Sequence, residues 1–151
     1  MKRLRVYVDT SVIGGPLDVE FAEASTRFFE FLTQGEFIAL VSALTAEEVE
    51  RAPLAVQESL SALPDSNTER VAVDEEARRL SQMYLAANVV PEASANDALH
   101  VAIATVARAD LIVSWNFKHL VNFRRIRGFN AVNLREGYPP IEIRSPKELL
   151  E

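Results

Sequence analysis

Three acidic residues and one amide stand at the ends of expected strands or helices, and three of the four fall where a strand leads into a helix. They are Asp9, Glu48, Asp97 and Asn116. Partly buried carboxylates about 4 Å apart repel each other by several kcal/mol unless protons or a cation neutralise them. Mg²⁺ prefers oxygen ligands and commonly binds one or two carboxylates together with substrate phosphate. If the fold gathers these residues, they predict metal-dependent hydrolysis of a phosphodiester, in which the ion activates water.

Each of these residues could instead cap a helix. The segments Thr45–Glu48 and Ser94–Asp97 have the spacing of capping boxes or close variants of them. Asp9 and Asn116 are of the residue types that commonly begin helices. Asp74, which also lies between a β-like run and a helix, is interpreted as a cap and nothing more. The sequence leaves the capping and catalytic interpretations of the other residues open.

The elements that must position these residues alternate between strands and helices. We expect strands at Leu4–Val8, Phe37–Ser42, Val71–Val73, Leu111–Trp115 and Ile141–Ile143, and helices at 20–33, Thr45–Ala52, Leu54–Leu63, a stretch ending at Ala87, Ala98–Ala107 and Phe123–Leu134. This alternation predicts a three-layer α/β fold in which helices flank a central, mainly parallel sheet. Open sheets of this class bind ligands outside the carboxyl ends of their strands, which is where three of the four candidate residues fall.

Composition limits the function classes. A chain of 151 residues, 48% of them hydrophobic, has the size of one domain, expected to span 1–151. It has no Cys, which excludes a disulfide scaffold, a zinc–thiolate site and a cysteine nucleophile. No apolar run approaches the roughly 18–20 residues of a membrane span, and the basic start lacks a secretory pattern. We therefore expect a cytoplasmic protein with no membrane partner.

One basic segment contrasts with the net charge of −6. Between residues 117 and 135 the chain has no acidic residue and carries Lys118, Arg124, Arg125, Arg127 and Arg135. Beside a metal site such a segment could hold the phosphates that flank a scissile bond in RNA, and binding would then depend on salt. The alternative is an ordinary solvated helix face.

Four ordered blocks of the sequence resemble the PIN-domain ribonucleases. They are Val-Tyr-Val-Asp9-Thr-Ser-Val-Ile, Ser42…Glu48-Val, Asn-Asp97-Ala-Leu-His-Val-Ala-Ile-Ala and Ile-Val-Ser-Trp-Asn116-Phe-Lys-His-Leu. The resemblance runs from Arg5 to about Ser145 and is greatest to VapC-type toxins of toxin–antitoxin pairs and their standalone relatives. It implies a PIN-like fold and a ribonuclease that depends on Mg²⁺ or Mn²⁺.

The resemblance also implies roles for individual residues. Asp9, Glu48 and Asp97 match the family's acidic metal-binding positions, while Thr10 and Ser114 match small hydroxylated neighbours that support the site beside the substrate. Glu48 matches better than Glu47 because the family's acid precedes an apolar residue, here Val49. Asn116 departs from the pattern, because the family often has a fourth acid there. An amide can accept a hydrogen bond from water but adds no charge, so the departure puts a second metal and full activity in doubt.

Partners and rival functions follow from the same resemblance. It implies an RNA substrate, a small antitoxin protein that blocks the site, and a homodimer. The main rival is a non-catalytic PIN-like module that binds RNA or protein, and a metal-dependent phosphatase is a third alternative.

His100 is expected to be a core or dimer-face residue, and Trp115 and Phe117 are expected to pack rather than to stack on a base.

Overall fold

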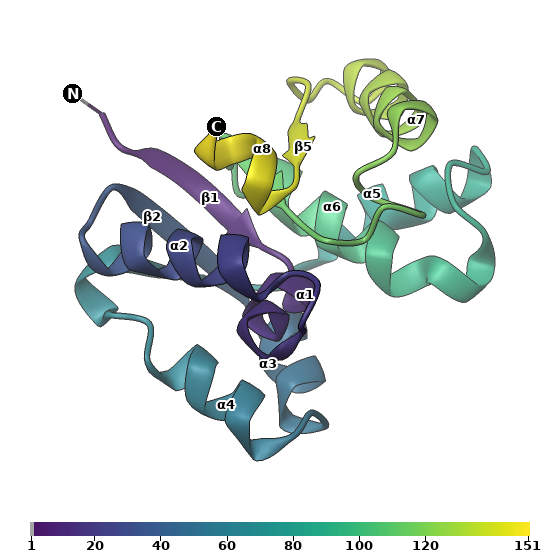
Figure 1. The fold of residues 1–151 in the computed structure, drawn as a ribbon. Helices are drawn as coiled ribbons and strands as arrows, with labels where there is room; N and C mark the ends of the chain where they lie inside the picture. The colour runs from purple at the N-terminus through teal and green to yellow at the C-terminus, as the bar shows by residue number, and fades with distance from the viewer. Residues whose placement is uncertain (1) are drawn as a thin grey trace.

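The computed structural model describes residues 2–151 and contains, within them, one sheet of five parallel strands. The strands are β1 (Leu4–Val8), β2 (Phe37–Ser42), β3 (Thr68–Val71), β4 (Leu111–Val113) and β5 (Glu142–Arg144). Their order across the sheet is β3-β2-β1-β4-β5, and Figure 1 shows β1 beside β2. In this order β1 is central, with Val8 opposite Val113 of β4. The carboxyl ends of β1, β2 and β4 therefore meet at one edge.

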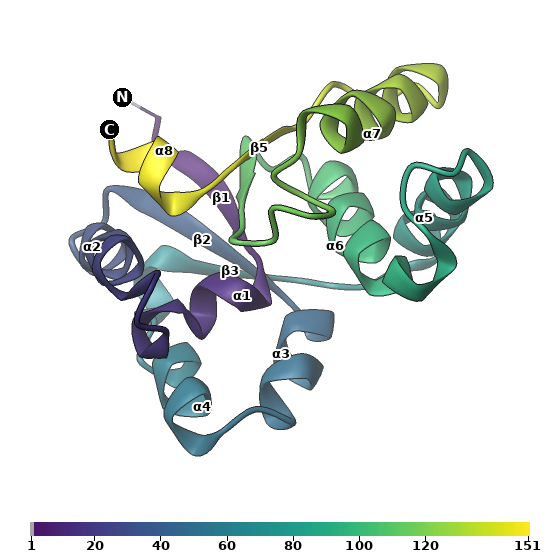
Figure 2. The ribbon, with the colours of Figure 1, turned by 45° about the vertical axis from the view of Figure 1, so that its right-hand side comes forward.

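Helices cover both faces of the sheet. They are α1 (Thr10–Ile13), α2 (Ala22–Thr33), α3 (Ala43–Glu50), α4 (Leu54–Ser61), α5 (Glu75–Ala86), α6 (Ala95–Val106), α7 (Phe123–Arg135) and α8 (Pro146–Leu150). Figure 2 shows α1, α2 and α4 on one side and α5, α6 and α7 on the other. This arrangement is the three-layer α/β fold that the sequence predicts.

The side chains of β1 alternate between the two faces of the sheet, and each face packs against its own layer of helices. Val6 and Val8 pack into one apolar cluster, shared with α1, α2 and α4, while Tyr7 packs into the other, shared with α5, α6 and α7. All three side chains are fully buried. Strands buried on both faces have apolar residues on both, as parallel sheets between helices require.

Several boundaries differ from those expected. β3 lies at Thr68–Val71, earlier than the expected Val71–Val73, and pairs with β2 at the edge of the sheet. An edge strand tolerates polar residues such as Glu69, so its apolar pattern is weak. The expected sheet was mainly parallel, and every pair of strands in residues 2–151 is parallel. The short helices α1 and α8 were not expected, and α1 buries Val12 and Ile13 where a loop was foreseen.

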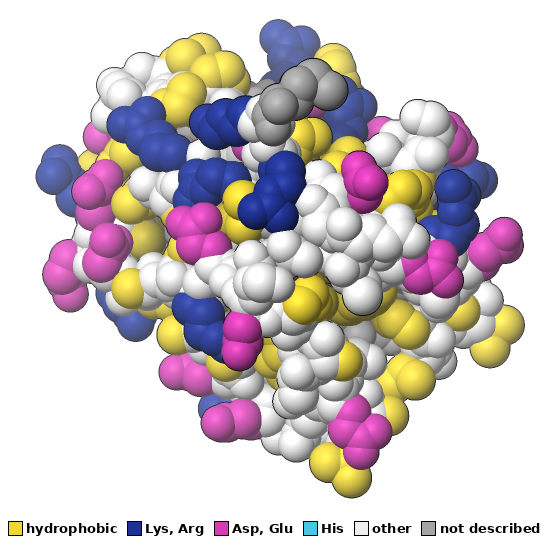
Figure 3. Space-filling model, turned by 90° about the vertical axis from the view of Figure 1, so that its left-hand side faces the viewer, with side chains coloured by type: hydrophobic (Ala, Val, Ile, Leu, Met, Phe, Trp, Pro, Cys, Tyr) yellow, Lys and Arg dark blue, Asp and Glu magenta, His cyan; other side chains and the backbone are white. Residues whose placement is uncertain are grey.

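Charged side chains of both signs share the surface. On the face drawn in Figure 3, Lys and Arg side chains lie among Asp and Glu side chains rather than in one unbroken patch. In the described part of the chain, residues 2–151, no helix is both long enough and apolar enough to cross a membrane.

Candidate active site

The side chains of the three acidic residues make no helix-capping hydrogen bond, although Asp9 occupies the N-cap position of α1. Ser42 is the N-cap of α3, where its Oγ accepts a hydrogen bond from the Thr45 backbone, so Glu48 has no capping role. Among the described residues, neither the Ser94 side chain at the start of α6 nor the Asp9 side chain at the start of α1 makes a capping bond. The expected capping boxes at Thr45–Glu48 and Ser94–Asp97 are therefore wrong.

Asp74 behaves as expected. Its Oδ1 accepts a hydrogen bond of 2.9 Å from the Ala77 backbone at the start of α5, so it is a helix cap. The contrast with the other acidic residues is informative, because a capping carboxylate has its backbone partner in the same helix turn. Glu48 and Asp97 need another explanation.

Asp9 is fixed by two serine hydroxyls at the ends of β1 and β4. Its Oδ2 accepts hydrogen bonds from Ser11 Oγ at 2.6 Å and Ser114 Oγ at 2.9 Å. Its backbone N–H donates to the Val113 carbonyl at 3.0 Å, which ties the two strand ends together. Ser114 thus has the supporting role that the sequence predicts. Ser11 was missed, although the Asp-Thr-Ser sequence placed it two residues from the acid.

Glu48 is held by Thr10 and His100. Its Oε1 accepts a hydrogen bond of 2.7 Å from Thr10 Oγ1 and lies 2.6 Å from His100 Nε2. Burial alone would raise the pKa of Glu48. The hydrogen bond and charge of His100, the bond from Thr10 and the charge of Arg51 outweigh burial and lower the pKa below its usual value. Glu48 is consequently ionised at neutral pH.

His100 lies at the centre of the site rather than only in the core. Its side chain is buried, with Nε2 at 3.8 Å from Asp9 Oδ1 and Nδ1 at 2.6 Å from the Tyr7 hydroxyl. Burial acts to lower the pKa of His100, but the bond to Glu48 and the charges of Asp9, Glu48 and Asp97 raise it overall. The expectation of a core residue is confirmed as to burial. No feature of the sequence indicated the contact with Glu48.

Asp97 belongs to the same electrostatic environment. It is half-buried, and its pKa is raised first by burial and then by the negative charge of Asp9. The charges of His119 and His100 and a bond from Asn116 act in the opposite direction without cancelling the rise. Asp9 and Glu48 thus lie at Nε2 of His100, and Asp97 lies one helical turn before His100 on α6.

Asn116 organises a turn after β4. Its Oδ1 accepts a hydrogen bond of 3.0 Å from the His119 backbone, and its own N–H donates to Ser114 Oγ at 2.9 Å. Its amide oxygen therefore has a structural partner. Close by, Nδ1 of His119 is buried and finds no hydrogen-bond partner anywhere in residues 2–151.

Trp115 packs as expected. Its ring stacks on Phe21 with centroids 4.3 Å apart, and its Nε1 donates a hydrogen bond of 2.8 Å to Ser25 Oγ. Its backbone N–H donates to Ser11 Oγ, which in turn donates to Asp9. Phe117 is about half exposed and lies beside both rings.

The basic segment is divided between structural and exposed side chains. Arg125 Nη1 donates a hydrogen bond of 2.6 Å to the Val89 carbonyl and so ties α7 to the segment after α5. The Arg127 guanidinium lies 5.7 Å from the centre of the Phe123 ring. Lys118, Arg124, Arg127 and Arg135 are exposed. In Figure 2, α7 lies beside α5 and α6, on the side of the molecule away from α4.

The carboxylate oxygens of Asp9, Glu48 and Asp97 are of the ligand type that a hard cation such as Mg²⁺ prefers. Within residues 2–151, no three His, Asp or Glu side chains are placed to share one ion, and Glu48 Oε1 faces Thr10 and His100 instead. Mg²⁺ sites commonly use one or two carboxylates and complete their coordination with water and phosphate. The negative charge of Asp9 raises the pKa of Asp97, so the two carboxylates repel each other. A cation would relieve that repulsion.

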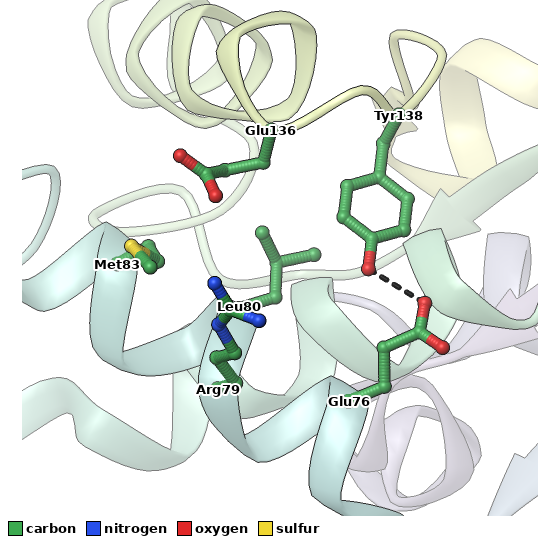
Figure 4. Close-up of a pocket in the computed structure, with 6 residues that line it drawn as sticks. All are labelled: Glu76, Arg79, Leu80, Met83, Glu136 and Tyr138. Atoms are coloured by element: carbon green, nitrogen blue, oxygen red, sulfur yellow. Dashed lines mark hydrogen bonds between the residues drawn. The ribbon is translucent and has the colours of Figure 1, made fainter.

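A separate pocket lies between α5 and the end of α7 (Figure 4). It has a volume of about 140 Å³, and its lining includes Tyr138, whose hydroxyl donates a hydrogen bond of 2.6 Å to Glu76. This bond raises the pKa of Tyr138 to about 12. The pocket contains none of the candidate site residues, so it is not part of the acidic site.

Comparisons with known proteins concern the fold. No protein-family model matches the chain, and no curated protein sequence matches it. Among solved structures, the chain is similar to one in VapBC2 from Rickettsia felis bound to a DNA fragment from their promoter, with 12% identity, a TM-score of 0.60, and 94% of this chain and 98% of that chain covered.

Two further solved structures are similar over nearly the whole chain. A chain of FitAB bound to an IR36 DNA fragment has 16% identity and a TM-score of 0.57, with 93% of this chain and 94% of that chain covered. A chain of FitAcB from Neisseria gonorrhoeae has 17% identity and a TM-score of 0.58, with 94% and 98% covered. The chain therefore has the PIN-domain fold that its four sequence blocks resemble.

Proposed function

We propose that this chain is a metal-dependent endoribonuclease that hydrolyses RNA phosphodiester bonds and acts as the toxin of a toxin–antitoxin pair. One observation carries the nuclease proposal: Asp9 and Glu48 both lie at Nε2 of the buried His100, and Asp97 lies one helical turn before this histidine on α6. The PIN-domain fold supports it, because ligands of such sheets bind at this edge.

Each residue of the site would have a separate role. Asp9, Asp97 and the ionised Glu48 would together hold Mg²⁺ or Mn²⁺. When bound, the ion would supply positive charge to the phosphate and favour the ionisation of water. Ser11 and Ser114 keep Asp9 in place by donating to one of its oxygens, and Thr10 does the same for Glu48. Asn116 would hold the turn that closes the site and position water.

The contacts proposed for RNA lie outside this acidic centre. Lys118, Arg124 and Arg127 are exposed and could pair with phosphates, which would make binding salt-dependent. Arg125 would contribute through its bond to the Val89 carbonyl rather than by free approach to RNA.

The test is cleavage of a labelled RNA with Mn²⁺ by the purified wild-type chain and by the Asp9→Asn variant. The amide keeps the acceptor oxygen for Ser11 and Ser114 but removes the charge that would hold the ion, so we expect cleavage to fall to background. Circular dichroism and thermal unfolding of the variant should match the wild type. RNA left intact by the wild-type chain, or cut equally fast by the variant, would contradict the proposal.

Partners are part of the same proposal. The similar structures contain VapBC2 and FitAB bound to DNA, and we propose that this chain likewise pairs with a small antitoxin that blocks its site and supplies DNA binding. We also propose that it forms a homodimer in the cytoplasm. Growth arrest on expression of the chain, relieved by a neighbouring gene product that copurifies with it, would support the pairing, and growth without arrest would contradict it.

Two observations favour the rival function of a non-catalytic binding module. Asn116 replaces a charge with an amide whose oxygen is already bonded to the His119 backbone, and Glu48 is already bonded to His100. In such a module the Asp9→Asn substitution would leave RNA or protein binding unchanged. Measuring binding of the same RNA in EDTA separates this function from cleavage.

A further inference from the structure

We propose that His100 is a positioning residue of the candidate nuclease site: it donates a hydrogen bond to Glu48 and so holds this carboxylate, which would bind the ion, in one orientation. The inference rests on the proposed function and adds to it a residue that the family resemblance does not assign. The carrying observation is a closed set of buried side-chain contacts that runs from α3 through β1 and α6 back to α3.

The direction of the bond to Glu48 follows from its partners. The contact between His100 Nε2 and Glu48 Oε1 is 2.6 Å long, and an ionised carboxylate can only accept hydrogen bonds. Nε2 therefore carries the hydrogen and donates it. Thr10 Oγ1 donates to the same oxygen, so two donors fix Oε1 and leave Oε2 as the oxygen that can turn to an ion or to water.

The other ring nitrogen is held by a tyrosine. His100 Nδ1 lies 2.6 Å from the Tyr7 hydroxyl, which lies 2.8 Å from Ser42 Oγ. A hydroxyl can donate and accept, so Tyr7 suits the ring whether or not Nδ1 carries a hydrogen. All three side chains are buried, so water does not compete for these bonds.

The set of contacts returns to its starting helix. Ser42 is the N-cap of α3, the helix that carries Glu48, and its Oγ accepts from the Thr45 backbone. Tyr7 belongs to β1 and lies two residues before Asp9. The imidazole thus fixes the distance between α3 and the end of β1, where the two carboxylates lie. A buried ring held at both nitrogens has a single orientation, which an exposed flexible residue would not have.

Residues that orient metal ligands have measurable effects. Changing such an outer partner typically costs about 10–100-fold in metal affinity or activity. We therefore expect His100→Leu to raise the Kd of the full-length chain for Mn²⁺ by about 10–100-fold. His100→Gln can still present an N–H to Glu48 and should restore most of the affinity.

Two further variants separate positioning from general packing. Tyr7→Phe removes only the support of His100 and should weaken Mn²⁺ binding less than His100→Leu does. Tyr84→Phe is the matched control: Tyr84 is also fully buried, in the same apolar cluster, but its hydroxyl bonds to Asn133, outside the candidate site. It should unfold as easily as Tyr7→Phe while binding Mn²⁺ like the wild type.

The measurement is Mn²⁺ binding by calorimetry and by electron paramagnetic resonance, with circular dichroism to confirm the fold. In a Glu48→Gln background, His100→Leu should cause little further loss, because its effect passes through Glu48. Equal Mn²⁺ affinity in the wild type, His100→Leu and Tyr7→Phe chains would overturn the positioning role. Nitrogen coupling in the Mn²⁺ spectrum would also overturn it, because His100 would then be a ligand itself.

The results that would contradict the proposed nuclease function differ from those that would contradict only the positioning role of His100. If the wild-type chain binds no Mn²⁺ and cuts no RNA, the nuclease proposal falls and the positioning role falls with it. If the wild type binds and cuts, the Asp9→Asn variant does neither, and the His100 variants match the wild type, only the positioning role is overturned.

Discussion

Gly15 packs so closely against Ser25 and Trp115 that no side chain fits at this position. A Cβ built there would lie 2.0 Å from Ser25 Oγ and 3.1 Å from Trp115 Nε1. These two groups are hydrogen-bonded to each other, and the Trp115 backbone is bonded to Ser11, which holds Asp9. The absence of a side chain at position 15 thus protects the packing behind the acidic site.

The adjacent glycine gives a matched comparison. Gly15→Ala should lower the free energy of unfolding by about 1–3 kcal/mol, because overpacking a filled interior forces its neighbours apart. At Gly14 a Cβ would meet only Val56 Cγ2, at 3.9 Å, and the backbone is helical, so Gly14→Ala should be neutral or slightly stabilising. Urea unfolding of both variants checks the difference, and equal midpoints would contradict it.

The sequence predicts acidic residues of the site better than it predicts their supports. Asp9, Glu48 and Asp97 could be proposed because their types and the blocks around them are local features. Tyr7 and His100 lie 93 positions apart in the chain, and their contact depends on the packing of α6 against β1. A histidine on an apolar helix gives no local sign of such a partner, so its place in the site could not be predicted.

At the scale of the elements, Arg5 joins three of them. Its guanidinium donates to Glu69 of β3 at 2.7 and 3.0 Å and to the Ala107 and Arg108 carbonyls at the end of α6. Strand β2 lies between β1 and β3, so the side chain links strands that are not neighbours. The bond to Arg5 lowers the pKa of Glu69, against a smaller opposing effect of burial.

The lowered pKa gives a pH dependence with a definite sign. The ionised Glu69 stabilises the fold above its unfolded pKa of about 4.5, and this contribution is lost as the pH falls through the lower folded pKa. Because Glu69 is 43% exposed, the loss in Glu69→Gln should be no more than about 1 kcal/mol at pH 7. It should shrink below pH 4.5.

Urea unfolding across this pH range is the measurement. Glu142→Gln is the control, because Glu142 pairs with Arg144 two residues away within β5 and links no separate elements. A loss in Glu69→Gln that stays constant down to pH 3 would show that the ion pair is not its cause.

The elements themselves could be predicted where a pattern is long or strongly apolar. α2, α5 and α7 have apolar residues at helical spacing over 12 or 13 residues, and β2 was expected at its observed bounds. α1 and α8 have 4 and 5 residues, too few to show a helical period. β3 is an edge strand of mixed polarity, so its own residues show no clear strand pattern. The expected strand was therefore placed later, at Val71–Val73, where two valines follow a segment of turn residues.

At the scale of the whole molecule, the proposed ion should act as a stabilising ligand. With Mn²⁺ at 100 times its Kd, binding to the folded chain alone adds about 2.7 kcal/mol to the free energy of unfolding. For a chain of 151 residues this corresponds to a rise in Tm of about 5–10 °C, which EDTA should reverse.

Asp97→Asn is the control for this experiment. It should lose the response to Mn²⁺, since one of the carboxylates proposed to hold the ion is gone. In EDTA it should be no less stable than the wild type, because the substitution removes repulsion between Asp97 and Asp9. A Tm that does not respond to Mn²⁺ in the wild type, or responds equally in the variant, would contradict a shared ion at this site.

The central place of β1 has a consequence for how the protein comes to be active during its synthesis. Asp9 leaves the ribosome more than a hundred residues before Ser114, which bonds to it, and before β4, which pairs with its strand. A nascent chain released before that point lacks the partner strand on one side of β1. Translation must therefore pass Ser114 before Asp9 gains this strand and this hydrogen-bond donor, so a shorter nascent chain cannot assemble the proposed nuclease site.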